Sequence, residues 1–111
     1  SNEGFLKNWP IKFELNGWFI SMKSGGSLKS HMHESGWLSG SIYINIPKKI
    51  EKNNGNLVLS TGIKSQEKII DLSTGTLCLF PASLHHFTIP FESREDRIVL
   101  AFDVKTKNSA P

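Results

Sequence analysis

The sequence predicts an all-β fold, a double-sheet jelly roll or barrel of about eight short antiparallel strands with little or no helix. The first observation behind this prediction is that short apolar or alternating segments recur along the chain, separated by turn residues roughly every ten positions. The second is that no window of about ten residues carries apolar side chains at the helical period between capping residues. A chain of 111 residues can enclose one hydrophobic core, so we expect a single domain over residues 1–111.

The strands are assigned from alternation and from the turn residues that bound each segment. Asn16-Gly17 and Asn54-Gly55 have the composition of tight hairpin turns. Residues 1–10 show no period and form an irregular lead-in, and residues 105–111 are expected to be a frayed tail. The strands are predicted over residues 11–15, 18–22, 38–46, 57–60, 68–72, 76–80, 86–90 and 97–104.

Composition and charge exclude several classes of protein. The net charge of +3 comes from lysines scattered over turns and the tail, which is unlike the basic stripe of a nucleic-acid-binding protein. No apolar run approaches the roughly 18 residues of a membrane-spanning helix. Cys78 is the single cysteine and lies in an apolar segment, so no disulfide can form within the chain. We therefore expect a soluble, cytoplasmic protein.

The four histidines fall into two pairs. If the chain is extended at the first pair, His31 and His33 point to the same side, because alternate residues of a strand share a face. Two imidazoles on one face make half a metal site. The second pair, His85 and His86, are neighbours and face opposite sides, so at most one of them joins the site. We favour His86, because His85 shares its face with the apolar Phe87.

The segment 38–46 has one apolar and one polar face. Its polar face carries two serines and the only tyrosine of the sequence, Tyr43. Such a strand commonly packs its apolar face in the core and leaves its polar face in water. In a small barrel that binds a ligand, the polar face can instead line the cavity. The pattern leaves both arrangements open.

Arg97 opens the last predicted strand, eleven residues after His86. It shares its face with small residues such as Val99, which leave room beside the guanidinium. From the pattern alone, two interpretations are equally good. Arg97 can anchor a ligand carboxylate through its planar fork of N–H donors, or it can form an exposed salt bridge with Glu95 or Asp96.

The order of these features resembles a known family. The segments HMHESGWLSGSIYINIP and LCLFPASLHHFTIPFESREDRIVLAFDV, between Trp18 and Val104, closely resemble the iron(II)/2-oxoglutarate-dependent oxygenases found alone or C-terminal to tetratricopeptide repeats in bacteria and phages. The resemblance is specific, because a histidine pair before GWLSG, a distant FPxxLxH and an arginine at the start of the last strand occur in this order. It implies a double-stranded β-helix, the cupin-like form of the jelly roll.

By this resemblance the metal is iron(II), the cosubstrate is 2-oxoglutarate, and the metal ligands are His31, His33 and His86. A carboxylate is usual at the position of His33 in the wider superfamily, so Glu34 is the alternative to His33. Glu34 is one residue out of phase with His31 in a regular strand and would need the strand to end or bulge at this point. We favour His33.

The same resemblance gives Arg97 the role of binding the distal carboxylate of 2-oxoglutarate and gives Tyr43 a second hydrogen bond to it. The implied reaction is the hydroxylation of a primary substrate, while 2-oxoglutarate and O2 are consumed to succinate and CO2. No catalytic side chain beyond the metal ligands is required, because the metal and cosubstrate carry the redox chemistry.

Two other functions fit the same residues. One is a cupin-like metal-binding enzyme that does not use 2-oxoglutarate, for which three histidines are a natural ligand set. The other is a non-catalytic jelly-roll binding module, since one fold hosts many functions. A peptide, a small molecule and a nucleotide are all compatible with the sequence as the primary substrate, and no membrane partner is expected.

Overall fold

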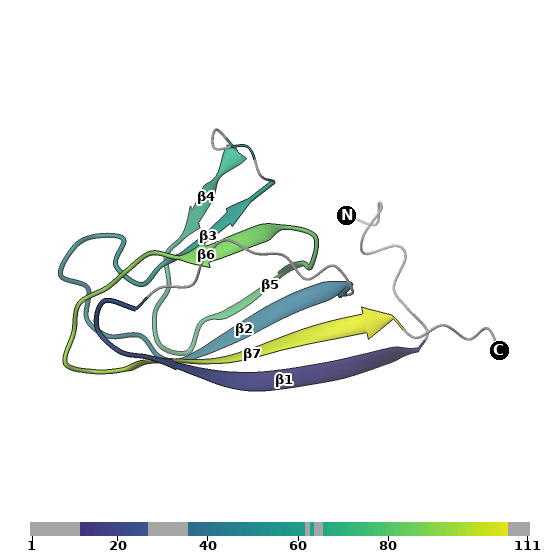
Figure 1. Cartoon of the computed structure of the whole chain (residues 1–111), viewed down its shortest axis with the longest axis horizontal. Helices are drawn as coiled ribbons and strands as arrows, with labels where there is room; N and C mark the ends of the chain where they lie inside the picture. The colour runs from purple at the N-terminus through teal and green to yellow at the C-terminus, as the bar shows by residue number, and fades with distance from the viewer. Residues whose placement is uncertain (1–11, 27–35, 62, 64–65, 107–111) are drawn as a thin grey trace.

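The computed structural model describes residues 12–26, 36–61, 63 and 66–106, and within these residues seven strands form two antiparallel sheets (Figure 1). The larger sheet has the strand order β1-β7-β2-β5, and the smaller sheet has the order β4-β3-β6. The strands are β1 (Phe13–Met22), β2 (Leu38–Asn45), β3 (Leu57–Ser60), β4 (Lys68–Ile70), β5 (Leu77–Pro81), β6 (His85–Thr88) and β7 (Arg97–Thr106). The predicted all-β, double-sheet fold is confirmed.

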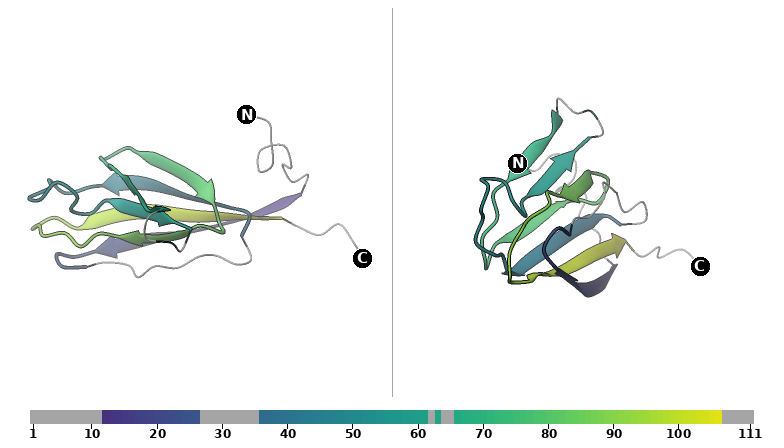
Figure 2. Two further views of the ribbon diagram at one scale, coloured as in Figure 1. Left: turned by 90° about the horizontal axis from the view of Figure 1, so that it is seen from above. Right: turned by 60° about the vertical axis from the view of Figure 1, so that its left-hand side comes forward.

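Each sheet is assembled from segments that are far apart in the sequence. β7, the last strand, lies between β1 and β2 and pairs with both, and β3 lies between β4 and β6. Consecutive strands such as β2 and β3 belong to different sheets, so the chain passes between the two layers, as in a jelly roll. Figure 2 shows the same arrangement from two further directions. In the described part of the chain, no helix has the length and hydropathy needed to cross a bilayer.

The hairpin predicted at Asn16-Gly17 is wrong, because β1 runs through this dipeptide as one strand. Asn16 is paired with Asp103 and Gly17 with Phe102 in an uninterrupted ladder of ten residue pairs. Gly17 does not have the positive φ that a tight hairpin turn requires. β7 offers a partner to every residue of β1, so long-range pairing overrides the local turn preference. Among the described residues there is therefore one strand fewer than predicted.

Other strand boundaries differ from the prediction by a few residues. β7 extends through Lys105 and Thr106, which were assigned to the tail, because β1 continues to pair with it. The second predicted hairpin turn, Asn54-Gly55, does contain a left-handed residue, since Gly55 has φ of 74°. It is not a β-hairpin, because β2 and β3 lie in different sheets.

The core lies between the two sheets, and β2 contributes its polar face to it. The core cluster is formed by Tyr43, Leu57, Leu72, Phe80 and Val99. The opposite face of β2 is the apolar one, and Ile44 on this face is 46% exposed. The pattern of the segment 38–46 thus corresponds to the arrangement in which the polar face lines a cavity.

Candidate active site

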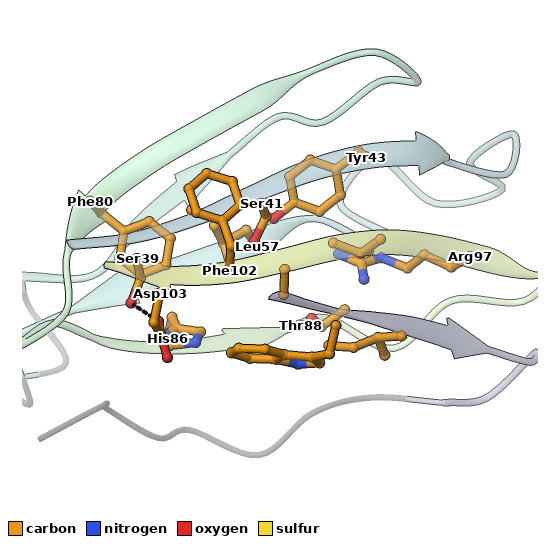
Figure 3. Close-up of a pocket in the computed structure, with 15 residues that line it drawn as sticks. Ser39, Ser41, Tyr43, Leu57, Phe80, His86, Thr88, Arg97, Phe102 and Asp103 are labelled. Carbon is orange, nitrogen blue, oxygen red and sulfur yellow. Dashed lines mark hydrogen bonds between the residues drawn. The ribbon is translucent and has the colours of Figure 1, made fainter. Parts of the chain in front are cut away.

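A cavity of about 190 Å3 lies between the sheets and is lined by residues of every strand except β4. Its walls are mainly apolar, with a few polar side chains among them (Figure 3). An engineered protein cavity of about 150 Å3 is large enough to bind benzene, so this cavity has room for a small organic molecule. The polar side chains on its wall are Ser39, Ser41, Tyr43, His86, Thr88, Arg97 and Asp103.

Arg97 is the most deeply buried charged group on the cavity wall, with 2% of its surface exposed. Its Nε donates a hydrogen bond to the Gly55 carbonyl at 3.0 Å, and its Cζ lies 5.3 Å from the centre of the Tyr43 ring. Burial lowers the pKa of Arg97, because desolvation disfavours the charged guanidinium, and the neighbouring Tyr43 opposes this shift. The backbone carbonyl accepts from Nε, and the terminal N–H groups, which lie beside Tyr43, have donors for a further acceptor.

Among the described residues, Arg97 has no carboxylate partner. Asp96 pairs instead with Lys23 at 3.5 Å, and the side chain of Glu95 accepts from Asn45 at 3.4 Å. The exposed salt bridge considered from the sequence is therefore not formed. A buried charge is costly unless it is paired, so Arg97 is suited to an anion that enters the cavity.

Tyr43 is 2% exposed and contacts the guanidinium from the neighbouring strand β2. Desolvation by burial raises the pKa of the Tyr43 phenol above its ordinary value, while a hydrogen bond with Ser41 opposes the rise. The hydroxyl therefore remains protonated at neutral pH and can act as a hydrogen-bond donor. Arg97 and Tyr43 together form a donor-rich end of the cavity.

His86 lines the cavity together with Thr88, whereas its neighbour His85 does not, in agreement with the predicted alternation. The His86 ring packs edge-on against Phe80, with ring centroids 5.0 Å apart. His86 Nδ1 lies 3.4 Å from the Leu84 carbonyl. If Nδ1 carries the proton and donates it to this carbonyl, Nε2 carries the lone pair, which is the form of imidazole that binds a metal ion.

The structure brings three of the six predicted site residues, Tyr43, His86 and Arg97, to one cavity. His31, His33 and Glu34 lie outside the described residues. Within the described ranges, no group of three or more His, Cys, Asp or Glu side chains is arranged to hold a metal ion. A complete metal site would therefore need ligands from outside those ranges in addition to His86.

Sequence reasoning missed Asp103, which is buried at 6% exposure and lines the same cavity. Its Oδ1 accepts a hydrogen bond from Ser39 Oγ at 2.8 Å. The signal that could have identified Asp103 is its spacing from Arg97, which is an even number of residues along the same strand. It lies six residues after Arg97 on one strand, so both side chains point to the same face.

The family model and the solved structures agree with each other. A family model described as "Putative 2OG-Fe(II) oxygenase" matches residues 16–103. The fold is similar to that of a Pseudomonas putida prolyl-4-hydroxylase, with TM-score 0.69 and 17% identity over 86% of this chain and 53% of that protein. It is similar to an oxidoreductase of the 2OG-Fe(II) oxygenase family from Burkholderia pseudomallei, with TM-score 0.70 and 13% identity over 89% of this chain and 48% of that protein.

A third similar structure is HygX from Streptomyces hygroscopicus with nickel and 2-oxoglutarate bound, with TM-score 0.66 and 13% identity over 90% of this chain and 60% of HygX. At these identities the likeness shows the fold. The chain spans about half the length of the solved relatives that it matches. Comparison with curated proteins finds no match.

Proposed function

Because the chain belongs to the 2OG-Fe(II) oxygenase family, as its motifs predicted, we propose that it is an iron(II)- and 2-oxoglutarate-dependent dioxygenase that hydroxylates a primary substrate. In this reaction 2-oxoglutarate and O2 would be consumed to succinate and CO2. The observation that carries the proposal is Arg97, a buried cation without a carboxylate partner among the described residues, at the wall of a cavity of about 190 Å3. Such a group is suited to the free carboxylate of a dicarboxylic acid.

Arg97 and Tyr43 are assigned to 2-oxoglutarate. The guanidinium is oriented by the Gly55 carbonyl through Nε, so its terminal N–H groups can form two parallel hydrogen bonds with a carboxylate. The protonated Tyr43 hydroxyl would add a third donor. These contacts hold one end of the cosubstrate and direct its other end along the cavity toward His86.

The metal is assigned to His86 together with His31 and His33, with Glu34 as the alternative to His33. His86 fits this role because its ring lines the cavity and its Nδ1 can be satisfied by Leu84. When bound, iron(II) and 2-oxoglutarate supply the oxidising chemistry, and the chain supplies their orientation. The apolar cavity wall, which includes Leu57, Phe80 and Val99, restricts water around the reacting groups.

The primary substrate must approach from outside, because a cavity of this size is largely filled by the cosubstrate. A peptide, a small molecule or a nucleotide can each present a C–H bond at the cavity opening. A cytoplasmic location is also proposed, since the single Cys78 is a free thiol and fits a reducing compartment.

The test is an anaerobic titration of the metal-free protein with iron(II) and then 2-oxoglutarate, observed through the weak visible charge-transfer band of the chelated complex. Wild type is expected to develop the band. Arg97→Ala is expected to need at least about 30-fold more 2-oxoglutarate, because losing one partner of a buried, hydrogen-bonded charge pair costs about 2 kcal/mol or more. Arg97→Lys should lie between the two, since lysine keeps the charge but loses the planar fork.

Three outcomes would contradict the proposal or the role it gives to Arg97. Iron binding without a band at any concentration of 2-oxoglutarate would favour a cupin-like metal enzyme. Failure to bind any metal would favour a non-catalytic binding module. An equal requirement for 2-oxoglutarate in wild type and Arg97→Ala would remove Arg97 from the cosubstrate site.

A further inference from the structure

Asp103 places a carboxylate on the cavity wall, and the proposed function gives it no role. It is 6% exposed and lies on the cavity-facing side of β7, as Arg97 does. Six residues of extended strand span about 20 Å, so the backbone positions of the two residues are well separated along the cavity. In the view of Figure 3, Asp103 and His86 are drawn at one end of the cavity, and Arg97 is drawn at the other end of the strand that carries Asp103. The cavity therefore has a cationic end and an anionic end.

The Asp103 carboxylate is held in a fixed orientation by Ser39. These residues are directly paired across β2 and β7, and Ser39 Oγ donates to Asp103 Oδ1 at 2.8 Å. Ser39 is itself buried, with 4% of its surface exposed. A serine hydroxyl is a neutral donor, so this bond fixes the carboxylate but leaves its negative charge in place.

A continuous set of contacts connects Asp103 with His86. Ser39 is paired with Phe80 on its other side, across β2 and β5. The Phe80 ring packs against the His86 ring at 5.0 Å between centroids. The neighbouring strands β7, β2 and β5 of the larger sheet carry Asp103, Ser39 and Phe80, and the Phe80 ring meets His86 of β6 in the smaller sheet, so all four residues line the same cavity.

We propose that Asp103 is a positioning residue for the metal ion that His86 binds, with its carboxylate accepting a hydrogen bond from a metal-bound water or from a ligating imidazole. The proposal rests on the proposed function, because it requires a metal at His86. Imidazole ligands are neutral and leave the charge of a divalent ion uncompensated. A fixed carboxylate beside the ligands offsets part of this charge and orients the groups that hold the ion.

The test is isothermal titration calorimetry of the metal-free protein with cobalt(II) in the absence of 2-oxoglutarate. Cobalt(II) is a divalent ion that resists oxidation in air. Asp103→Asn removes the charge but keeps the size of the side chain and an oxygen that can accept from Ser39. We expect cobalt affinity to fall about 10- to 100-fold, the usual effect of losing an outer carboxylate. Asp103→Glu, which keeps the charge, should bind more tightly than Asp103→Asn.

Two further variants serve as controls. Glu92→Gln removes one negative charge from an exposed loop position outside the cavity and should leave cobalt affinity unchanged. Ser39→Ala keeps the charge of Asp103 but releases its orientation, so a smaller loss is expected. Thermal unfolding of each metal-free variant shows whether the fold is retained, and Ser39→Ala provides a second test of the pair if Asp103→Asn does not fold.

The outcomes separate this proposal from the proposed function. If Asp103→Asn binds cobalt as wild type does while His86→Ala does not, the positioning role is overturned and the metal site stands. The carboxylate would then be assigned to a cationic or hydrogen-bond-donating group of the primary substrate. If wild type itself does not bind cobalt, both proposals fail.

Discussion

At the scale of the residue, Tyr43 and Arg97 illustrate how burial changes the chemistry of a side chain. Both are 2% exposed, and they contact each other through the face of the tyrosine ring. Burial disfavours ionisation of the phenol and also disfavours the charge of the guanidinium. The result is a neutral donor next to a cation that gains from a bound anion.

Tyr43 allows a direct measurement of this effect, because it is the only tyrosine in the sequence. Its pKa is raised in the folded state, chiefly by desolvation. The raised pKa makes a contribution to the free energy of unfolding that is fully present below about pH 10, the ordinary tyrosine pKa. This contribution is lost as the pH rises through the pKa of Tyr43 in the folded protein. We expect tyrosinate absorbance to appear at a higher pH in the native protein than in urea.

The stability measurement complements the spectroscopic one. In urea unfolding of wild type, the free energy of unfolding should decline between about pH 9 and pH 11. The decline should be smaller in Tyr43→Phe, since phenylalanine cannot ionise. Coincident tyrosinate titrations of native and unfolded protein would show that the phenol is not desolvated, and would remove the argument for a protonated Tyr43 donor.

At the scale of the element, the connection from β2 to β3 positions Arg97. Gly55 N donates to the Ile89 carbonyl at 3.0 Å, and Ile89 N donates to the Asn56 carbonyl at 2.9 Å. The connection is thus fixed beside the segment that follows β6, with the Gly55 carbonyl directed at Arg97. Asn56 is 1% exposed and accepts from Leu72 N at 3.0 Å, which fastens the same connection to the chain after β4.

Gly55→Ala tests this positioning against Gly25→Ala. Both glycines have positive φ, at 74° and 83°, so alanine should cost about 1–2 kcal/mol at either site. A Cβ at Gly55 would lie 3.7 Å from Arg97 Nε, whereas nothing lies within 4 Å of a Cβ at Gly25. We expect similar losses in urea midpoint, and a weaker affinity for 2-oxoglutarate in Gly55→Ala alone. An equal affinity in both variants would show that the Gly55 carbonyl does not orient Arg97.

At the scale of the whole molecule, the two faces of the larger sheet have different environments. The face toward the smaller sheet forms the core and the cavity. The opposite face carries large apolar side chains that are well exposed, among them Leu15 at 63%, Phe19 at 70% and Leu79 at 56%. Substitutions on the two faces should therefore differ strongly in their effect on stability.

One substitution made at two positions measures this difference. Leu72 is 2% exposed and belongs to the core cluster, so Leu72→Ala should lower the free energy of unfolding by about 2–5 kcal/mol. Leu79 is 56% exposed, so Leu79→Ala should change it by no more than about 0.5 kcal/mol. Chemical denaturation of both variants provides the comparison, and similar losses would mean that the outer face is also packed in solution.

The sequence alone was enough to predict features that depend on the alternation of side chains along a strand. It identified His86 instead of His85 as the cavity residue and grouped Arg97 with Val99 on one face. It also identified Leu57–Ser60 as a strand with both boundaries correct. These features follow from the two-residue period of an extended chain, because alternate residues in the sequence share one face of a strand.

The sequence by itself determined the all-β fold class, the facing of the histidine and arginine on the last two strands, and the family. Only the tertiary structure decided that Asn16-Gly17 continues β1, that Gly55 orients Arg97, and that Asp103 shares a cavity with His86. The reason is that the first two depend on partners more than 40 positions away, and that Asp103 and His86 lie on strands of different sheets. Local propensity cannot specify such a partner, whereas pairing between distant strands selects it.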